Sequence, residues 1–459
     1  MSAKRSGRTR SPRSAPTTDE RTARRRFVAV SFLFWLPLGL TIAPLVLLFT
    51  ERGMTLVAVA GFFAAHALTA AALELPTGGL SDVIGRRPVL AAAGLLNLAA
   101  LTLLGLGTAA WVLTLGMVLM GAARALSSGP AESWYVDTVQ AQSGPDAELR
   151  AGLARGSAAS SAALAVGTLL GGALPWLLGL VPGLGTDLRT YTSGLVLLLS
   201  VPALLGVVVE LVFVLYVLGS LPEPSRAQAT PRGVLRGVPA TIADGLRLGT
   251  RDVLIRRILL SAGAAGTALA TIELLTPGRA AELTGAADSG AVLFAGLASA
   301  GFVCSALGSH LAPFVARLAG SGERAVLTGL AAGATGLLLL GATVTSSGAV
   351  PVALAAGGYG LVYLGLGAAG PSESELLHRR VGASGRATAL SVQSLSLQLV
   401  GAAAGLAVGV LPAGPLPWLL GAVALLVGAL LWTRGAAPAD EPRERRPAVE
   451  AASPASLAG

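Results

Sequence analysis

The sequence is poor in charge, and this restricts the kind of protein it can form. Of its 459 residues, 12% are charged and 53% are hydrophobic, whereas an average soluble domain carries about 25% charged residues. A soluble protein cannot hide that much apolar surface, because its own exterior must contact water. The composition therefore excludes an ordinary soluble domain and indicates that lipid solvates much of the chain.

Groups that carry covalent or metal chemistry are also scarce. Cys304 is the single cysteine, so no intrachain disulfide can form, and one cysteine with three histidines makes no metal-ligand cluster. The sequence has no Gly-x-x-x-x-Gly-Lys-Ser/Thr loop to hold ATP phosphates. Neither a Ser/His/Asp set nor a pair of carboxylates stands in a soluble domain. We therefore expect no metal, no cofactor and no enzymatic activity.

Long apolar runs are what the sequence has in abundance. They are about 18–28 residues long, enough to cross a hydrocarbon core of about 30 Å. They predict an all-α, polytopic membrane protein with twelve transmembrane helices, near residues 27–49, 55–76, 88–108, 111–136, 155–181, 192–219, 253–276, 289–315, 324–345, 350–377, 386–410 and 415–433.

The basic residues give the orientation of these spans. With the N-terminus inside, inner segments hold 29 of the 33 lysines and arginines, the outer loops hold Arg52, Arg189 and Arg279, and Arg124 lies within a span. Such asymmetry predicts cytoplasmic termini. The net charge of +9 then reflects topology and attraction to anionic lipid, and not nucleic-acid binding. Five segments follow: a disordered N-tail (1–26), a six-helix half (27–221), a linker with an amphipathic helix (222–252), a second half (253–433) and a disordered C-tail (434–459).

One inner loop carries an unusual concentration of charge and glycine, in the stretch ELPTGGLSDVIGRRPVL that begins at Glu74. Asp82 can accept hydrogen bonds at a helix N-terminus, Gly85 permits a tight reversal, and Arg86 and Arg87 offer planar forks to carboxylates. From Gly78 onward the stretch resembles the signature between spans 2 and 3 of the major facilitator superfamily.

This resemblance implies two parallel six-helix halves around a central cavity, and a conformational latch. Asp82 would dock near Arg386, at the start of span 11, and a loop arginine would join an acid of span 4, for which the candidates are Glu132 and Asp137. The latch would hold the outward-facing state. The alternative is a static element that only fixes topology.

Span 5 contains a partial match to the family's antiporter motif. Gly167, Gly171 and Gly172 are in place, but Thr168 stands where the family has proline. The match favours exchange, although such glycines also serve plain helix packing.

Ionisable residues within spans are costly in lipid, so each is a functional candidate. Glu74, Arg124 and Glu273 are the candidates for proton or charge coupling; the alternative for Glu74 and Arg124 is a structural ion pair between spans. Glu210 and His66 are expected to be packed, structural residues.

The resemblance also implies that spans 1, 4, 7 and 10 line the cavity. Aromatic and amide side chains there, or on the adjacent span 11, are candidates to contact substrate, with packing as the alternative: Phe34, Trp35, Tyr359, Tyr363, Gln393 and Gln398. Tyr359 and Tyr363 are four residues apart and so share a helix face.

Together these features predict a secondary active transporter that works by alternating access. Proton-coupled efflux of a hydrophobic or amphipathic small molecule is the favoured function, by a monomer in the bacterial plasma membrane. The stretches ELPTGGLSD, SGPAES and RATALS look like a branch of drug-resistance-like permeases. The alternatives are an uptake symporter or facilitator for a small metabolite and, more distantly, a non-transporting membrane receptor or scaffold.

Overall fold

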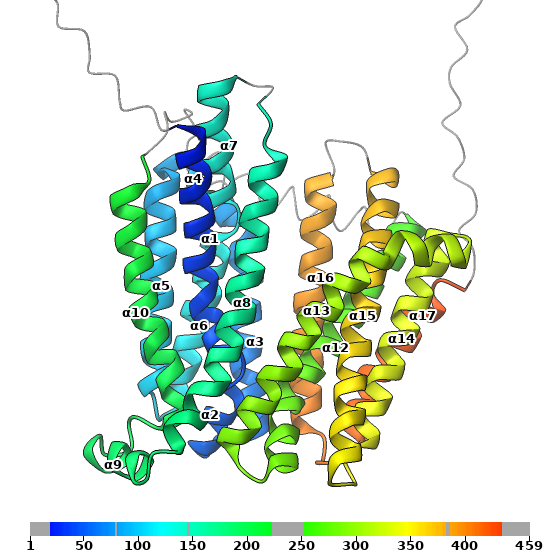
Figure 1. Cartoon of the computed structure of the whole chain (residues 1–459). Coiled ribbons are helices and arrows are strands. Elements are labelled where there is room, and N and C mark those ends of the chain that lie inside the picture. Colours follow the sequence, from blue (N-terminus) through cyan, green and yellow to red (C-terminus); the bar gives the residue numbers. More distant parts are fainter. Residues whose placement is uncertain (1–18, 79, 145–146, 223–251, 382–385, 434–459) are drawn as a thin grey trace, which may run out of the picture.

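In the computed structural model, which describes residues 19–78, 80–144, 147–222, 252–381 and 386–433, all regular structure is helical. Two helical bundles stand side by side (Figure 1). The first holds α1 (Glu20–Ile42), α2 (Leu45–Glu51), α3 (Leu56–Gly78), α4 (Leu80–Ile84), α5 (Arg86–Leu106), α6 (Ala110–Ser127), α7 (Pro130–Ser143), α8 (Arg150–Gly179), α9 (Leu184–Tyr191), the 3-10 turn η1 (Leu198–Ser200) and α10 (Val201–Ser220). The second holds α12 (Val253–Thr284), α13 (Ala287–Ala319), α14 (Gly322–Ala342), α15 (Ala349–Arg380), α16 (Arg386–Val410) and α17 (Leu416–Leu430).

The helices confirm the predicted membrane architecture. Eleven helical segments of the described chain are long and apolar enough to cross a bilayer, and α17 is a shorter apolar helix of 15 residues. Six of these twelve segments fall in each bundle. Leucine and valine side chains are exposed along several of them, for example on α10 and α17, as expected for helices that face lipid.

Some predicted boundaries differ from the observed ones. α1 begins at Glu20, so residues 20–26, predicted to belong to the N-tail, are helical. The first predicted span is broken at Pro44 into α1 and α2, because proline cannot donate the backbone hydrogen bond that would continue the helix. The fourth is broken at Gly129, whose φ of 95° favours glycine, and α7 then continues it to Ser143.

Two pairs of helices bring the bundles together: α8 packs against α13, and α3 packs against α16. We call the membrane side on which the described chain ends (Glu20 and Thr433) lie the tail side, and the opposite side the distal side. The bundles are apart on the tail side and close together on the distal side (Figure 1).

Apolar side chains from both bundles close the distal side. Leu274 of α12 and Val408 of α16 belong to one buried cluster with Val46 and Phe49 of α2. Ala291 of α13 is buried in a second cluster with leucines of α2 and η1. We call these two clusters the distal contacts. Because they remove apolar surface from water, they stabilise the conformation in which the distal side is shut.

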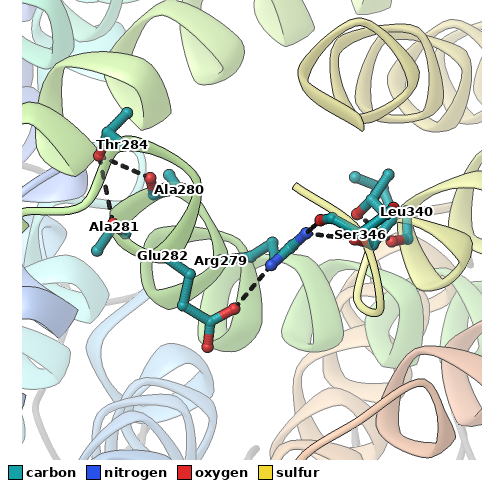
Figure 2. Close-up of polar contacts among 8 residues, drawn as sticks. Arg279, Ala280, Ala281, Glu282, Thr284, Leu340 and Ser346 are labelled. Atoms are coloured by element: carbon teal, nitrogen blue, oxygen red, sulfur yellow. Dashed lines mark hydrogen bonds and ion pairs between the residues drawn. The ribbon is translucent and has the colours of Figure 1, made fainter. Parts of the chain in front are cut away.

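In each bundle an arginine side chain binds backbone carbonyls at the end of the third long helix, α5 or α14. Arg52, which follows α2, donates to the backbone oxygens of Leu104 at 2.7 Å and Gly105 at 2.5 Å, where α5 ends. Arg279 of α12 donates to the backbone oxygens of Thr343 and Ser346, just beyond α14, and pairs with Glu282 at 2.9 Å (Figure 2). Carbonyl groups near helix C-termini lack intrahelical donors, and these guanidinium groups supply them.

Parts of the predicted organisation lie outside the described residues. They are the N-tail up to residue 18, the linker over 223–251 with its expected amphipathic helix, and the C-tail from residue 434. Asp252, at the end of the linker, caps α12 by accepting hydrogen bonds from the backbone N–H groups of Leu254 and Ile255.

Candidate functional site

Three adjoining cavities occupy the space between the bundles. Their volumes are about 470, 320 and 180 Å³. Arg124, near the end of α6, lines all three, so the cavities adjoin one another at this residue. We call the largest the vestibule, the second the aromatic chamber and the third the side pocket.

The vestibule lies on the tail side and is polar. It is lined by Glu74, Glu132 and a group of serines that includes Ser157, Ser160 and Ser161 of α8. These serines lie three and four residues apart and so occupy one helix face. That spacing in the sequence GSAASS is the signal by which the polar wall could have been found, and our sequence analysis missed it.

The aromatic chamber lies deeper between the bundles. Phe34 and Trp35 of α1 and Tyr359 and Tyr363 of α15 all line it, as the resemblance implied. The two tyrosine rings stack with centroids 5.0 Å apart. The chamber therefore offers ring faces from both bundles to an apolar or aromatic molecule.

Other chamber residues were not predicted. Phe63, Phe294 and Phe302 contribute further rings, and Asn97 adds an amide. Phe302 meets Tyr363 edge to face at 6.4 Å between centroids. The three phenylalanines lie on α3 and α13 and Asn97 lies on α5. These helices are not among the spans that the resemblance places at the cavity, so no pattern in the sequence singled these residues out.

Charged groups stand where the chamber meets the side pocket. Arg124 comes from the first bundle and Glu273 from the second, and both line both cavities. Within the described part of the chain, neither side chain makes an ion pair or a hydrogen bond. Glu273 is exposed although it lies mid-bundle, because its exposed surface faces the cavity. Opposite charges held apart in this way are available to a ligand.

In the part of the chain that it describes, the structure lacks the ion pair that was the alternative for two of these residues, and it places His66 at the cavity. An ion pair between Glu74 and Arg124 was the structural alternative to a role in coupling, and no such pair is formed within the described residues. His66 was expected to pack inside the bundle, yet it lines both the chamber and the side pocket. The packing of α3 against α6 and α16, which the sequence does not encode locally, turns His66 toward the cavity.

Glu74 has a partner in the other bundle. Gln398 Nε2 of α16 donates to Glu74 Oε2 at 3.3 Å and to Ser394 Oγ at 3.0 Å. Two residues proposed for different roles, coupling and substrate contact, are thus joined across the vestibule. Gln393, half-buried on the same helix, is not among the residues that line the three cavities.

The signature loop forms part of its predicted network. Gly85 has φ 102° and precedes α5, where it permits the reversal that the sequence predicted. Arg86 pairs with Asp137 of α7 at 2.8 Å, and Arg87 donates to the carbonyl oxygen of Leu218. Of the two predicted acids, Asp137 is the one in this pair, while Glu132 lines the vestibule.

The remaining parts of the predicted latch are not seen directly. The side chains of Asp82 and Arg386 lie outside the described residues. The observed pair joins α5 to α7 and so lies within the first bundle. A contact between the bundles through Asp82 stays a prediction.

The three glycines of α8 serve two different contacts. Gly167 and Gly171 face α1, at Gly39 and Leu40. Gly172 faces the other bundle, and a Cβ placed there would lie 2.5 Å from the carbonyl oxygen of Ala291. The motif therefore combines packing within the first bundle with close approach of the two bundles at the distal side.

The family follows from comparison with known proteins. The family model described as "Major Facilitator Superfamily" matches residues 27–406. The chain belongs to this superfamily. No curated protein is significantly similar to this chain in sequence. As a superfamily member it is a multi-pass integral membrane transporter and not an enzyme.

Solved transporter structures share the fold. A mutant of the nucleoside transporter NupG has a TM-score of 0.71 at 13% identity, with 89% of this chain and 98% of that chain covered. A peptide transporter POT in complex with sulfate has a TM-score of 0.62 at 15% identity, covering 90% and 93%. The POT family transporter PepTSo has a TM-score of 0.64 at 12% identity, covering 89% and 96%. At such identities the likeness shows the fold of this superfamily member, and not its substrate.

Proposed function

We propose that this transporter exports a hydrophobic or amphipathic small molecule in exchange for protons, by alternating access. The observation that carries the proposal is the composition of the central site. Rings from both bundles form the aromatic chamber, and the ionisable groups Arg124, Glu273 and Glu74 line it or the cavities that adjoin it. A molecule with an apolar body and one polar or charged end fits such a site.

Alternating access is supported by the asymmetry of the contacts between bundles. The vestibule opens toward the tail side, while the distal contacts and Gly172 hold the other side shut. With the tail side assigned to the cytoplasm, as the arginine distribution predicts, this conformation faces inward. We take the protein to be a monomer of the bacterial cell membrane with both termini cytoplasmic, in the branch of drug-resistance-like permeases.

Glu74 is the group that we assign to proton coupling. It lies on α3 in the vestibule, in reach of solvent from the tail side, and its hydrogen-bond partner, Gln398, belongs to the other bundle. Protonation of Glu74 would weaken this charge-assisted hydrogen bond and so bias the equilibrium between the two conformations. Proton binding and the movement of the bundles would then be coupled.

Uptake of a small polar metabolite is the second candidate. The serine wall of the vestibule and the charges of Arg124 and Glu273 suit a polar molecule as well. The related structures named above include a nucleoside transporter and peptide transporters, which is in keeping with this alternative. It shares the central site with the first candidate and differs in substrate polarity and direction.

Transport by purified protein in vesicles would decide between these candidates. We would impose a pH gradient and follow aromatic cations, nucleosides and dipeptides together with proton flux, for the native chain, Glu74→Gln and a control, Glu375→Gln. Glu375 is exposed on α15 and pairs with Arg379, outside the central site. Proton-driven movement of the aromatic cations that Glu74→Gln abolishes and Glu375→Gln retains supports the proposal. Proton-driven uptake restricted to the polar solutes would establish the alternative.

A further inference from the structure

A second concave surface lies on the outside of the first bundle, where α1 and α8 run side by side. It is a groove of about 800 Å³. On α1 it is lined by Arg24 and Arg25 at one end and then by residues one and two turns further along, from Val28 to Leu33. On α8 it is lined by Arg155 and the alanines that follow one turn later. These positions repeat at intervals of three or four residues, so each helix presents one continuous face.

Three arginines stand at one end of this groove with their charges uncommitted. Within the described part of the chain, Arg24, Arg25 and Arg155 form no hydrogen bond or ion pair. Glu20 and Glu148 act electrostatically on the Tyr135 hydroxyl together with Arg24 and Arg155, but neither acid lines the groove. The described residues that line the groove include these three arginines and no acid, so this end of the groove is basic and would attract an anion.

The rest of the groove is apolar. From Arg25 to Phe32 the helix rises about 10 Å, and along this length the wall is formed by Val28, Ala29, Phe32 and Leu33. The groove thus passes from a basic rim at the tail side into an apolar wall inside the membrane span. This order of charge and apolar surface matches a phospholipid, whose phosphate lies at the interface and whose acyl chain lies beneath it.

The groove is separate from the transport site. The opposite face of α1, with Val30, Ser31 and Phe34, lines the vestibule. Helix α1 therefore has the transport site on one side and the groove on the other. Occupation of one does not require occupation of the other.

We propose that the groove between α1 and α8 binds an anionic phospholipid, with its phosphate among Arg24, Arg25 and Arg155 and an acyl chain along Val28 and Phe32. Arginine suits this role because its planar fork makes paired hydrogen bonds to phosphate oxygens. The bound lipid would pack α1 against α8 from outside. The proposal rests on charge and shape of the groove and is independent of the transported substrate.

Lipid retention by the purified full-length protein tests the proposal. We would measure by native mass spectrometry the binding of phosphatidylglycerol and phosphatidylcholine to the native chain and to the triple variant Arg24→Gln/Arg25→Gln/Arg155→Gln. A charge-matched control would carry Arg256→Gln, Arg317→Gln and Arg324→Gln, three exposed arginines at the tail side of the second bundle. We expect phosphatidylglycerol to bind roughly tenfold or more weakly to the triple variant, and the control to behave as the native chain.

Several results would overturn the proposal. If the control variant lost as much phosphatidylglycerol binding as the triple variant, general surface charge would explain the binding. If phosphatidylcholine bound the native chain as well as phosphatidylglycerol did, no anionic headgroup would be needed. Full competition by inorganic phosphate would assign the arginines to a soluble anion. Thermal unfolding in lipid-free detergent would verify folding, and if the triple variant were unfolded, Arg155→Gln alone would be compared with Arg256→Gln by the same criteria.

Discussion

Gln398 of α16 donates a 3.3 Å hydrogen bond to the carboxylate of Glu74 of α3, and this bond links the two bundles across the vestibule. The residues are far apart in sequence and come from opposite halves of the transporter. Because the bond is made in the conformation that is open to the tail side, it stabilises that conformation relative to any other in which the bundles have moved.

Replacing Gln398 should therefore shift the conformational equilibrium. Gln398→Leu removes a bond worth about 1 kcal/mol, so the tail-open population should fall by about fivefold relative to the other state. Spin labels at Ala154→Cys and His378→Cys, both exposed on the tail side, would report the distance between bundles in a Cys304→Ala background. Gln393→Leu, on the same helix but outside the cavities, is the control and should leave the distance distribution unchanged.

Two neighbouring glycines of α8 should respond differently to the same substitution. At Gly172 a Cβ meets Ala291 of the other bundle, whereas at Gly171 it meets Leu40 of the same bundle, 2.8 Å from the carbonyl carbon. Gly172→Ala should oppose closure of the distal side and shorten the tail-side label distance. Gly171→Ala should instead lower the thermal unfolding temperature, since overpacking costs about 1–3 kcal/mol. If both variants changed only stability, Gly172 would have no part in closure.

Substitutions in the ion pair between Arg86 and Asp137 would distinguish a conformational latch from a static support. The pair is partly exposed, so as a support alone it stabilises the fold by about 1 kcal/mol or less. We expect Asp137→Asn to slow vesicle transport several-fold while the unfolding temperature hardly changes, because a latch acts on the conformational change. The exchange Arg86→Asp/Asp137→Arg should recover part of the rate. A variant with native transport would favour the static support.

Asn97 holds the buried carboxylate of Glu210. Its Nδ2 donates to Glu210 Oε2 at 3.2 Å, and Glu210 is fully buried, as expected for a structural residue. Asn97→Leu leaves that carboxylate without this donor and should destabilise the fold by about 1–3 kcal/mol. Glu210→Gln cannot ionise and keeps an acceptor for Asn97, so it should cost less. Thermal unfolding of both variants in detergent checks this order.

The carboxylate that caps α12 should make stability depend on pH. Burial opposes ionisation of Asp252, but hydrogen bonds from Arg380 at 2.5 Å and from two backbone N–H groups outweigh it and lower its pKa. The stabilisation is then fully present above the unfolded pKa of about 3.9 and is lost as pH falls below that value toward the folded pKa. Asp252→Asn keeps the cap and loses the ion pair, so its deficit in unfolding temperature should shrink over that acidic range.

Much of the fold could be predicted because membrane spans leave a local signal. Apolar runs and arginine positions gave twelve helices in two halves, and the signature around Asp82 gave the family. Breaks within spans were harder to predict: Pro44 lies inside the first predicted span, yet it divides α1 from α2. Proline sets a local preference, and the packing around it decides whether the helix kinks or ends.

Residues of the central site could be predicted only where it was enough to know which helices line the cavity. Phe34, Trp35, Tyr359 and Tyr363 lie on spans that the resemblance places at the cavity, and they line it. The contact between Glu74 and Gln398, the exposure of His66 to the cavity and the exclusion of Gln393 depend on how α3 and α16 are rotated against each other. Sequence periodicity gives the face that residues share, but not the direction in which that face points.

The arginines at the helix ends bear on how much positive charge the outer side of the folded protein exposes. Arg52 and Arg279 are two of the three basic residues that the charge distribution places in outer loops, against the general asymmetry. Their guanidinium groups are bound to backbone carbonyls of Leu104, Gly105, Thr343 and Ser346. In the folded protein these guanidinium groups are therefore held by the carbonyl dipoles of helix ends and are not free to bind lipid headgroups. Arg189, exposed on α9, is then the outer-loop arginine whose side chain makes no such bond within the described residues, so the accessible positive charge of that side is concentrated there.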